Sequence, residues 1–178
     1  MRVGEKNMFK FSESFKNVEK DLGYIVSKIM EDEKLLKLLS LQEDRIEKLS
    51  TKEKKEILEE CIYITPNISL KKDRKPWSYI SIVFDNFTPN EGNPEYRDKI
   101  LYFDIICPID TWNMGDFKLR PYQIAGCLDV LFDKKPLVGT YTINFLGAEK
   151  LTVDTTVCGL MSLYAVTYGV KADGYDEE

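Results

Sequence analysis

The sequence predicts an α+β fold, in which a mainly antiparallel four-stranded sheet carries helices on one face and follows a two-helix N-terminal region. Two patterns support this α-α-β-β-α-β-β order: apolar residues at helical spacing in the first third of the chain, and alternating apolar residues in the remainder. With 178 residues and 43% apolar composition, we expect a single domain. It comprises a helical region over 1–66, a sheet-plus-helix core over 76–171 and an acidic tail over 172–178.

The N-terminal helices are predicted from apolar spacing and from a capping signal. Apolar residues at intervals of four and three predict a helix over about 12–40, with a break near Asp32. The polar run over 42–48 predicts a turn after it. Ser50 and Glu53 fit a capping box, in which each side chain satisfies a free backbone N–H, so a second helix should begin after Ser50.

Alternating apolar residues predict the strands. They are expected near 79–84, 101–107, 138–145 and 160–170, with a short extended piece near 151–153. The connection over 86–98 contains Pro and Gly, which favours an antiparallel pair joined by a long loop. Pro121 suits the first position of a helix, where its missing N–H is not needed, and this helix should end near Asp133.

The chain contains no histidine. Histidine is the side chain used most often as a general acid or base, as the partner of a catalytic serine or cysteine, and as a zinc ligand. The four cysteines lie at least 20 residues apart, too far for a CxxC motif, and no phosphate-binding glycine loop is present. We therefore predict no catalytic residue, no cofactor and no metal, and we expect reduced thiols.

The net charge of −5 is unevenly distributed. Residues 1–75 hold 17 Lys and Arg against 15 Asp and Glu, whereas residues 76–178 hold 8 against 15. The basic run over 71–75, followed by Trp77, is of a type that contacts nucleic-acid backbones, but a solvated loop is the simpler interpretation in an acidic protein. No segment resembles a membrane span or a secretory signal, so we expect a soluble protein made in the cytoplasm.

The best enzymatic interpretation is a metal-dependent nuclease, because such sites need only carboxylates and a lysine. Asp104, Asp110 and Asp116, with Lys118 two residues after Asp116, form a D…DxK pattern. The active set of this alternative is Asp104, Asp116 and Lys118. Because Gly115 places the triplet in a predicted loop, solvated loop acids are the competing interpretation.

The segment over 108–117 places large apolar side chains in a predicted loop. Trp and Met are enriched in the cores of interfaces, so this segment is a candidate subunit contact. The alternative is that Trp112 folds back over the core of its own domain. The candidate assembly residues are Trp112, Met114, Phe117, Arg120, Tyr122, Phe87 and Tyr96.

Several segments follow one another in a recognisable order. They are Ile29-Met30, Leu35 to Leu39, Tyr79 to Ile82 leading to Asn86, Phe103 to Pro108, Arg120 to Gly126, Leu137 to Gly139 and Leu163 to Val170. This succession resembles the small neck proteins of tailed double-stranded DNA phages, the tail-completion or tail-terminator-like proteins that form rings between portal and tail. It also resembles the portal-proximal ring proteins of crAss-like phages.

The resemblance implies an α+β protomer in a homo-oligomeric ring of the virion, made in the host cytoplasm and without catalysis. Such a ring binds portal, other neck or tail proteins, and double-stranded DNA passes through it without specific binding. An acidic sheet half would suit this passage, because it would keep DNA from adhering. A neck protein is our first hypothesis. A small nuclease and a monomeric cytoplasmic adaptor domain are the alternatives.

Overall fold

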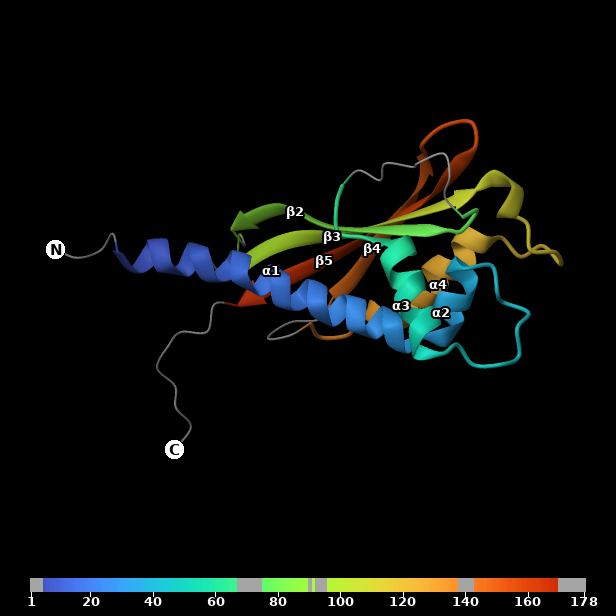
Figure 1. Ribbon diagram of the computed structural model, residues 1–178. Helices are drawn as coiled ribbons and strands as arrows, with labels where there is room; N and C mark the ends of the chain where they lie inside the picture. The colour runs from blue at the N-terminus through green and yellow to red at the C-terminus, as the bar shows by residue number, and fades with distance from the viewer. Residues whose placement is uncertain (1–4, 67–74, 90, 92–95, 138–142, 170–178) are drawn as a thin grey trace.

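A computed structural model describes residues 5–66, 75–89, 91, 96–137 and 143–169. A five-stranded sheet forms one layer, and the helices pack against one of its faces (Figure 1). The predicted α+β class and the placement of the helices on one face are therefore confirmed.

The elements follow the predicted order, with one additional short strand. The helices are α1 (Glu5–Glu31), α2 (Glu33–Leu39), α3 (Thr51–Cys61) and α4 (Arg120–Phe132), and a 3₁₀ turn covers Ile109–Thr111. The strands are β1 (Ile62–Tyr63), β2 (Tyr79–Pro89), β3 (Tyr96–Pro108), β4 (Ile143–Thr152) and β5 (Val157–Gly169).

Local side-chain chemistry explains where the helices begin. Asp32 separates α1 from α2, because its carboxylate accepts a hydrogen bond from the backbone N–H of Leu35 at 2.9 Å and caps the new helix. At α3, Ser50 Oγ accepts from the N–H of Glu53, and the Glu53 carboxylate accepts from the N–H of Ser50. Pro121 lies in the first turn of α4. The predicted break, capping box and proline start are confirmed.

The strands are ordered β1-β2-β3-β5-β4 in the sheet. β1 pairs with β2 in parallel, whereas the other neighbours pair antiparallel. The predicted four-stranded sheet is thus corrected to a mixed sheet of five, because a two-residue strand is too short to show alternation in a sequence. Residues 151 and 152 of the extended piece predicted near 151–153 belong to β4, whose pairing with β5 shifts register between Phe145 and Gly147.

The two faces of the sheet differ in what covers them. Successive side chains of a strand point to opposite faces, and on β3 Leu101, Phe103 and Ile105 face the helices and are fully buried. Phe103 stacks on Phe132 of α4, with 5.3 Å between ring centroids, which seats α4 on the sheet. The alternate positions of β3, such as Asp104, lie on the opposite face, which we call the open face.

A buried ion pair anchors α1 to the sheet. Lys99 Nζ of β3 lies 3.2 Å from Asp21 Oδ2 of α1, and both side chains are inaccessible to solvent. The ammonium also lies 3.6 Å from the centroid of the Phe84 ring. Burial lowers the pKa of Lys99 to about 8 despite the nearby Asp21, and it raises the pKa of Asp21. Beyond this anchor, the N-terminal part of α1 continues past the end of the sheet (Figure 1).

Three of the predicted segments lie wholly or partly outside the described residues: the basic run over 71–74, the strand start over 138–142 and the acidic tail over 172–178. Lys75, which closes the basic run, lies 4.1 Å from the centroid of the Trp77 ring. Among the helices in the described ranges, none has the length and apolar character of a membrane span.

Candidate assembly surface

The loop between β3 and α4 forms a turn, closed by backbone hydrogen bonds, that presents one large apolar side chain to solvent. An isolated bridge between Asn113 and Leu119 closes the turn. Gly115, Asp116 and Phe117 all have positive φ angles, of 84°, 48° and 60°, which the tight turn requires. Phe117 is fully exposed at its tip. A large apolar side chain in that position has no partner in the described part of the chain.

Trp112 and Met114 pack onto the domain itself. Both are partly buried against the hydrophobic core. The indole Nε1 of Trp112 donates a hydrogen bond to the Cys158 carbonyl at 3.2 Å, which ties the loop to the start of β5. Trp112 thus packs on the core of its own domain, and its part in a subunit contact stays a prediction.

Arg120 is a buried connector rather than an exposed contact. Its Nε donates to the Thr111 carbonyl at 2.8 Å, and its Nη1 donates to the Leu38 carbonyl at 2.9 Å. Both Nη atoms also donate to the Glu43 carboxylate. Burial opposes the ionisation of Glu43, but the hydrogen bonds from Arg120 outweigh it and lower the pKa of Glu43. Arg120 thus fixes the loop, α2 and the turn after α2 relative to one another.

The outward side of α4 carries an apolar stripe. Tyr122 and Val130 are 55% and 75% exposed, and Gly126 lies between them at the i+4 spacing that places all three on one side of the helix. With Asp32 and Lys34 at the start of α2, the stripe lines a groove of about 340 Å³. The groove therefore lies next to the C-terminal end of α1.

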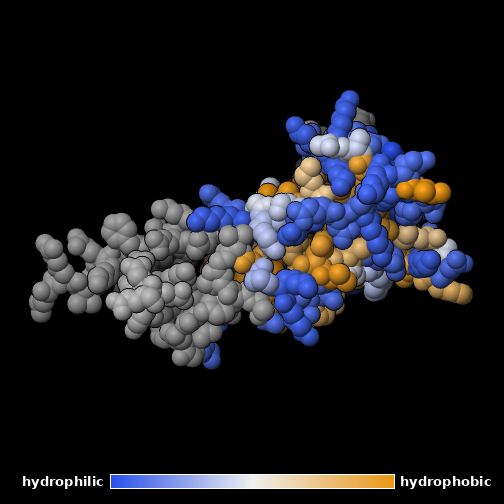
Figure 2. All heavy atoms as spheres, turned by 90° about the horizontal axis from the view of Figure 1, so that it is seen from below, coloured by the Kyte–Doolittle hydropathy of each residue, from blue (hydrophilic) through white to orange (hydrophobic). Residues whose placement is uncertain are grey.

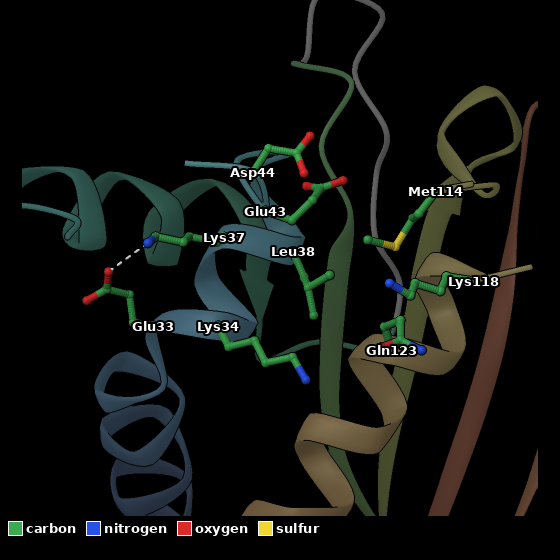
Figure 3. A pocket seen from close by; sticks show the side chains of 9 residues that line it. All are labelled: Glu33, Lys34, Lys37, Leu38, Glu43, Asp44, Met114, Lys118 and Gln123. Carbon is green, nitrogen blue, oxygen red and sulfur yellow. Dashed lines mark ion pairs between the residues drawn. The ribbon is translucent and has the colours of Figure 1, made fainter. Parts of the chain in front are cut away.

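A second hollow, of about 590 Å³, continues this groove between α2 and the loop before α4 (Figure 3). Lys34 and Gln123 line both hollows. Lys37 is paired with Glu33 at 3.0 Å, whereas the Lys34 and Lys118 ammonium groups point into the space without an ion pair among the described residues. We call the two hollows together the α2–α4 groove. It is lined by Asp32, Glu33, Lys34, Lys37, Leu38, Glu43, Asp44, Met114, Lys118, Tyr122, Gln123, Gly126, Cys127 and Val130.

The candidate assembly residues therefore separate into groups. Phe117 and Tyr122 are exposed. Trp112 and Met114 pack against the core, and Arg120 is buried and hydrogen-bonded within the domain. Figure 2 shows this helical side of the molecule, where hydrophobic patches interrupt a hydrophilic surface.

Phe87 and Tyr96 belong to the opposite end of the sheet. Phe87 is half-buried on β2, and its ring centroid lies 5.9 Å from the Lys99 ammonium. Tyr96 is the first residue of β3, and its side chain lies outside the described ones. The structure does not bring these two residues to the loop that follows Pro108. The sequence analysis missed Lys34 and Val130, although the spacing from Tyr122 to Val130 was a usable signal.

The three residues of the nuclease alternative are not brought together. Asp104 lies on the open face, Lys118 lines the groove on the helical side, and Asp116 lies in the exposed turn. Burial raises the pKa of Asp104, and its Oδ1 has no hydrogen-bond partner. Within the described ranges, no three His, Cys, Asp or Glu side chains are grouped so that they could hold a metal ion.

The model of the family described as YomW matches residues 32–166, which extend from the start of α2 into β5. The match includes the whole α2–α4 groove and most of the sheet. No curated protein matches the chain.

Proposed function

Because the chain belongs to the YomW family, a family associated with phage genomes, we propose that it is a structural protein of the phage particle. In this proposal it forms a homo-oligomeric ring in the neck, joins portal or head-completion proteins to the tail, and lets double-stranded DNA pass without catalysis. The protein would be made in the host cytoplasm and act in the virion.

The exposed apolar stripe of α4 is the observation that carries the proposal. Tyr122 and Val130 lie eight positions apart on the same side of α4, along a groove, and Phe117 extends into solvent from the adjacent turn. Exposed apolar side chains that gather next to a groove are typical of surfaces that another protein covers. A subunit of a larger assembly needs such a surface, whereas a monomer gains nothing from exposing it.

The edges of the sheet give further support. β2 runs from Tyr79 to Pro89, and within the described residues β1 pairs with it at Ile80 and Ser81. β4 forms the other edge of the sheet and has β5 as its neighbour in the described part of the chain. Free backbone donors and acceptors along an edge can pair with a neighbouring chain, so each edge offers a contact for a ring of identical subunits.

Negative-stain imaging of the purified protein tests this proposal, combined with a DNA-cleavage assay in Mg²⁺. We expect rings with a central opening and no cleavage. A monomer that cleaves DNA, and loses this activity in Asp116→Ala, would establish the nuclease alternative instead. A monomer without cleavage, both alone and with phage neck proteins added, would favour the adaptor alternative and refute the ring.

A further inference from the structure

Cys107 and Cys158 lie opposite each other on two neighbouring strands of the sheet. Cys107 is near the end of β3 and Cys158 near the start of β5, and the antiparallel register pairs the two residues directly. Side chains at directly opposed positions lie on the same face of a sheet. Cys107 belongs to the core beneath the helices, so both thiols lie on the face that the helices cover. Both are free thiols in this structure, with Cys107 buried and Cys158 partly exposed.

The spacing of the two strands at this point suits a disulfide bond. Directly opposed residues of an antiparallel pair have their Cα atoms about 4.5–5.5 Å apart, within the range of about 4.4–6.8 Å that a disulfide bond spans. Gly159, next to Cys158, shows that the backbones lie close, because a side chain added there would collide with the Ile105 carbonyl of β3. The Cβ atoms of an opposed pair are about 4.5–5.5 Å apart and need to approach by about 1 Å. A disulfide bond therefore requires only a small adjustment of the sheet.

The two thiols differ in access, and this difference orders their reactions. A small reagent can reach Cys158 first, because Cys158 is partly exposed and Cys107 is not. Burial raises the pKa of Cys107 to about 11. The Ser78 hydroxyl and the Arg120 guanidinium oppose this increase in the pKa of Cys107, and the Cys158 thiol adds to it. Cys107 is therefore a poor nucleophile toward dissolved reagents, but it lies beside the residue that reacts with them.

We propose that Cys107 and Cys158 form a reversible disulfide bond by exchange with a low-molecular-weight disulfide such as oxidised glutathione. The Cys158 thiolate attacks one sulfur of the reagent, forms a mixed disulfide and expels one thiolate of the reagent. Cys107 then attacks the Cys158 sulfur and expels the second thiolate. The protons of the two cysteine thiols pass through solvent to the two expelled thiolates. Two protein thiols are thus oxidised to one disulfide bond, and one small disulfide is reduced to two thiols.

The bond would lock the base of the loop that carries Phe117. Trp112 Nε1 already donates a hydrogen bond to the Cys158 carbonyl, so the loop is tied to the same point of β5. The segment closed by the bond would include this loop, α4 and β4, over 51 positions from Cys107 to Cys158. A cross-link of this length stabilises the folded state, chiefly by restricting the unfolded chain. Because the Cβ atoms must approach, the bond is strained, and a thiol reductant should open it again.

The surroundings of the protein would set the state of the pair. The cytoplasm keeps thiols reduced, whereas disulfide bonds persist outside the cell. The exchange reaction itself is independent of the ring. Its occasion in the life of the protein rests on the proposed function, since a released phage particle leaves the cytoplasm.

Peptide mapping of the purified full-length protein tests the proposal. The reduced protein is incubated with oxidised glutathione, treated with N-ethylmaleimide to block the remaining thiols, and digested with trypsin without reductant. Each cysteine lies on its own tryptic peptide. We expect the peptides of Cys107 and Cys158 to be linked in a chain that stays monomeric on a non-reducing gel, with Cys61 and Cys127 blocked, and dithiothreitol to open the link. Four blocked thiols, a lasting glutathione adduct on Cys158, or a link to Cys61 or Cys127 would overturn the proposal.

Cysteine variants separate the two steps. Cys107→Ala should accumulate a glutathione adduct on Cys158, and Cys158→Ala should leave Cys107 as a thiol. An adduct on Cys107 in the second variant would contradict the order of the steps. Cys61→Ala is the matched control, because Cys61 is as buried as Cys107, and it should form the link as the wild type does.

Thermal melting tests the locking of the loop. Oxidation should raise the melting temperature of the wild type by about 5 °C and leave that of Cys158→Ala unchanged. Equal melting temperatures of the reduced and the linked wild type would contradict the locking. Because mapping gives the same answer for a monomer and for a ring, a failure here leaves the proposed function to the imaging experiment.

Discussion

The two faces of the sheet differ in whether a buried charge has a partner of opposite charge. On the face that the helices cover, Lys99 is completely buried and paired with Asp21. On the open face, five residues further along the same strand, Asp104 has no ion pair among the described residues. One carboxylate oxygen of each aspartate, Oδ1, is buried without a hydrogen-bond partner, so the difference lies in the ammonium beside Asp21. A charge removed from water is stable only when a partner replaces the water, whereas a half-buried charge keeps part of its hydration. The covered face therefore depends on its pair, and the open face tolerates a charge that contributes little to stability.

The largest expected effect comes from breaking the buried pair. Lys99→Met leaves the Asp21 carboxylate buried without its ammonium, and we expect the free energy of unfolding to fall by about 3–5 kcal/mol. The double variant Asp21→Leu with Lys99→Met should recover most of this loss, because no unpaired charge remains. Urea unfolding of the three proteins checks the prediction. A single variant as stable as the wild type would show that the pair does not anchor α1.

The stability of Lys99→Met should depend on pH, which gives a second test of the buried pair on the covered face. Burial raises the pKa of Asp21 above its ordinary value of 3.8, and without Lys99 it should rise further. A carboxyl with a raised pKa binds its proton more tightly in the folded state, so stability falls as the pH rises from 3.8 through the folded pKa. Lys99→Met should therefore be least stable at neutral pH and recover in acid. A loss that is constant between pH 4 and pH 7, measured by thermal melting, would contradict this account.

A smaller loss of free energy of unfolding is expected when Arg120 is replaced. Its charge is also buried, but it has several hydrogen-bond partners. Arg120→Ala removes hydrogen bonds to the Thr111 and Leu38 carbonyls and to the Glu43 carboxylate. Because the Glu43 side chain keeps part of its exposure, we expect a loss of about 2–3 kcal/mol. Hydrogen exchange should show faster opening of the loop before α4 than of β3. Uniform acceleration throughout the sheet would contradict a local role.

The smallest change in the free energy of unfolding is expected for a substitution on the open face, and this change is an increase. Asp104→Val removes an unpartnered carboxylate from a strand position that favours β-branched residues, and it should raise the free energy of unfolding by about 1 kcal/mol at neutral pH. The gain should shrink as the pH falls through the raised pKa of Asp104 and vanish below 3.8, because Asp104 of the wild type is then neutral in both the folded and the unfolded state. Glu149→Val is the control, since Glu149 is exposed on the same face of β4. Destabilisation by Asp104→Val would show that the carboxylate has a structural role.

Interactions between residues close in sequence were sufficient to predict most helices and strands. Contacts between residues far apart in sequence could not be predicted. The break at Asp32 and the box at Ser50 depend on residues three positions apart, so the sequence contains the whole interaction. β1 has two residues and exists only because β2 lies beside it. The packing of Trp112 depends on the Cys158 carbonyl, 46 positions away, which periodicity cannot reveal.

The same distinction applies to the candidate site. The sequence singled out Phe117 and Tyr122, which the structure exposes, because their residue types are unusual in loops and helix starts. It could not indicate that Lys34, from another helix, lies beside Tyr122 and Val130. A groove between two helices is a property of their packing, and only the structure shows it.

The central claim is that copies of this chain assemble into a homo-oligomer, with the exposed residues Tyr122 and Val130 of α4 at a contact between them. Native mass spectrometry of the wild type beside Val130→Asp tests it most directly. The account predicts one discrete multiple of the 20.7 kDa protomer for the wild type and a shift to the protomer mass for the variant. A wild type at the protomer mass, or the same multiple for both proteins, would contradict it.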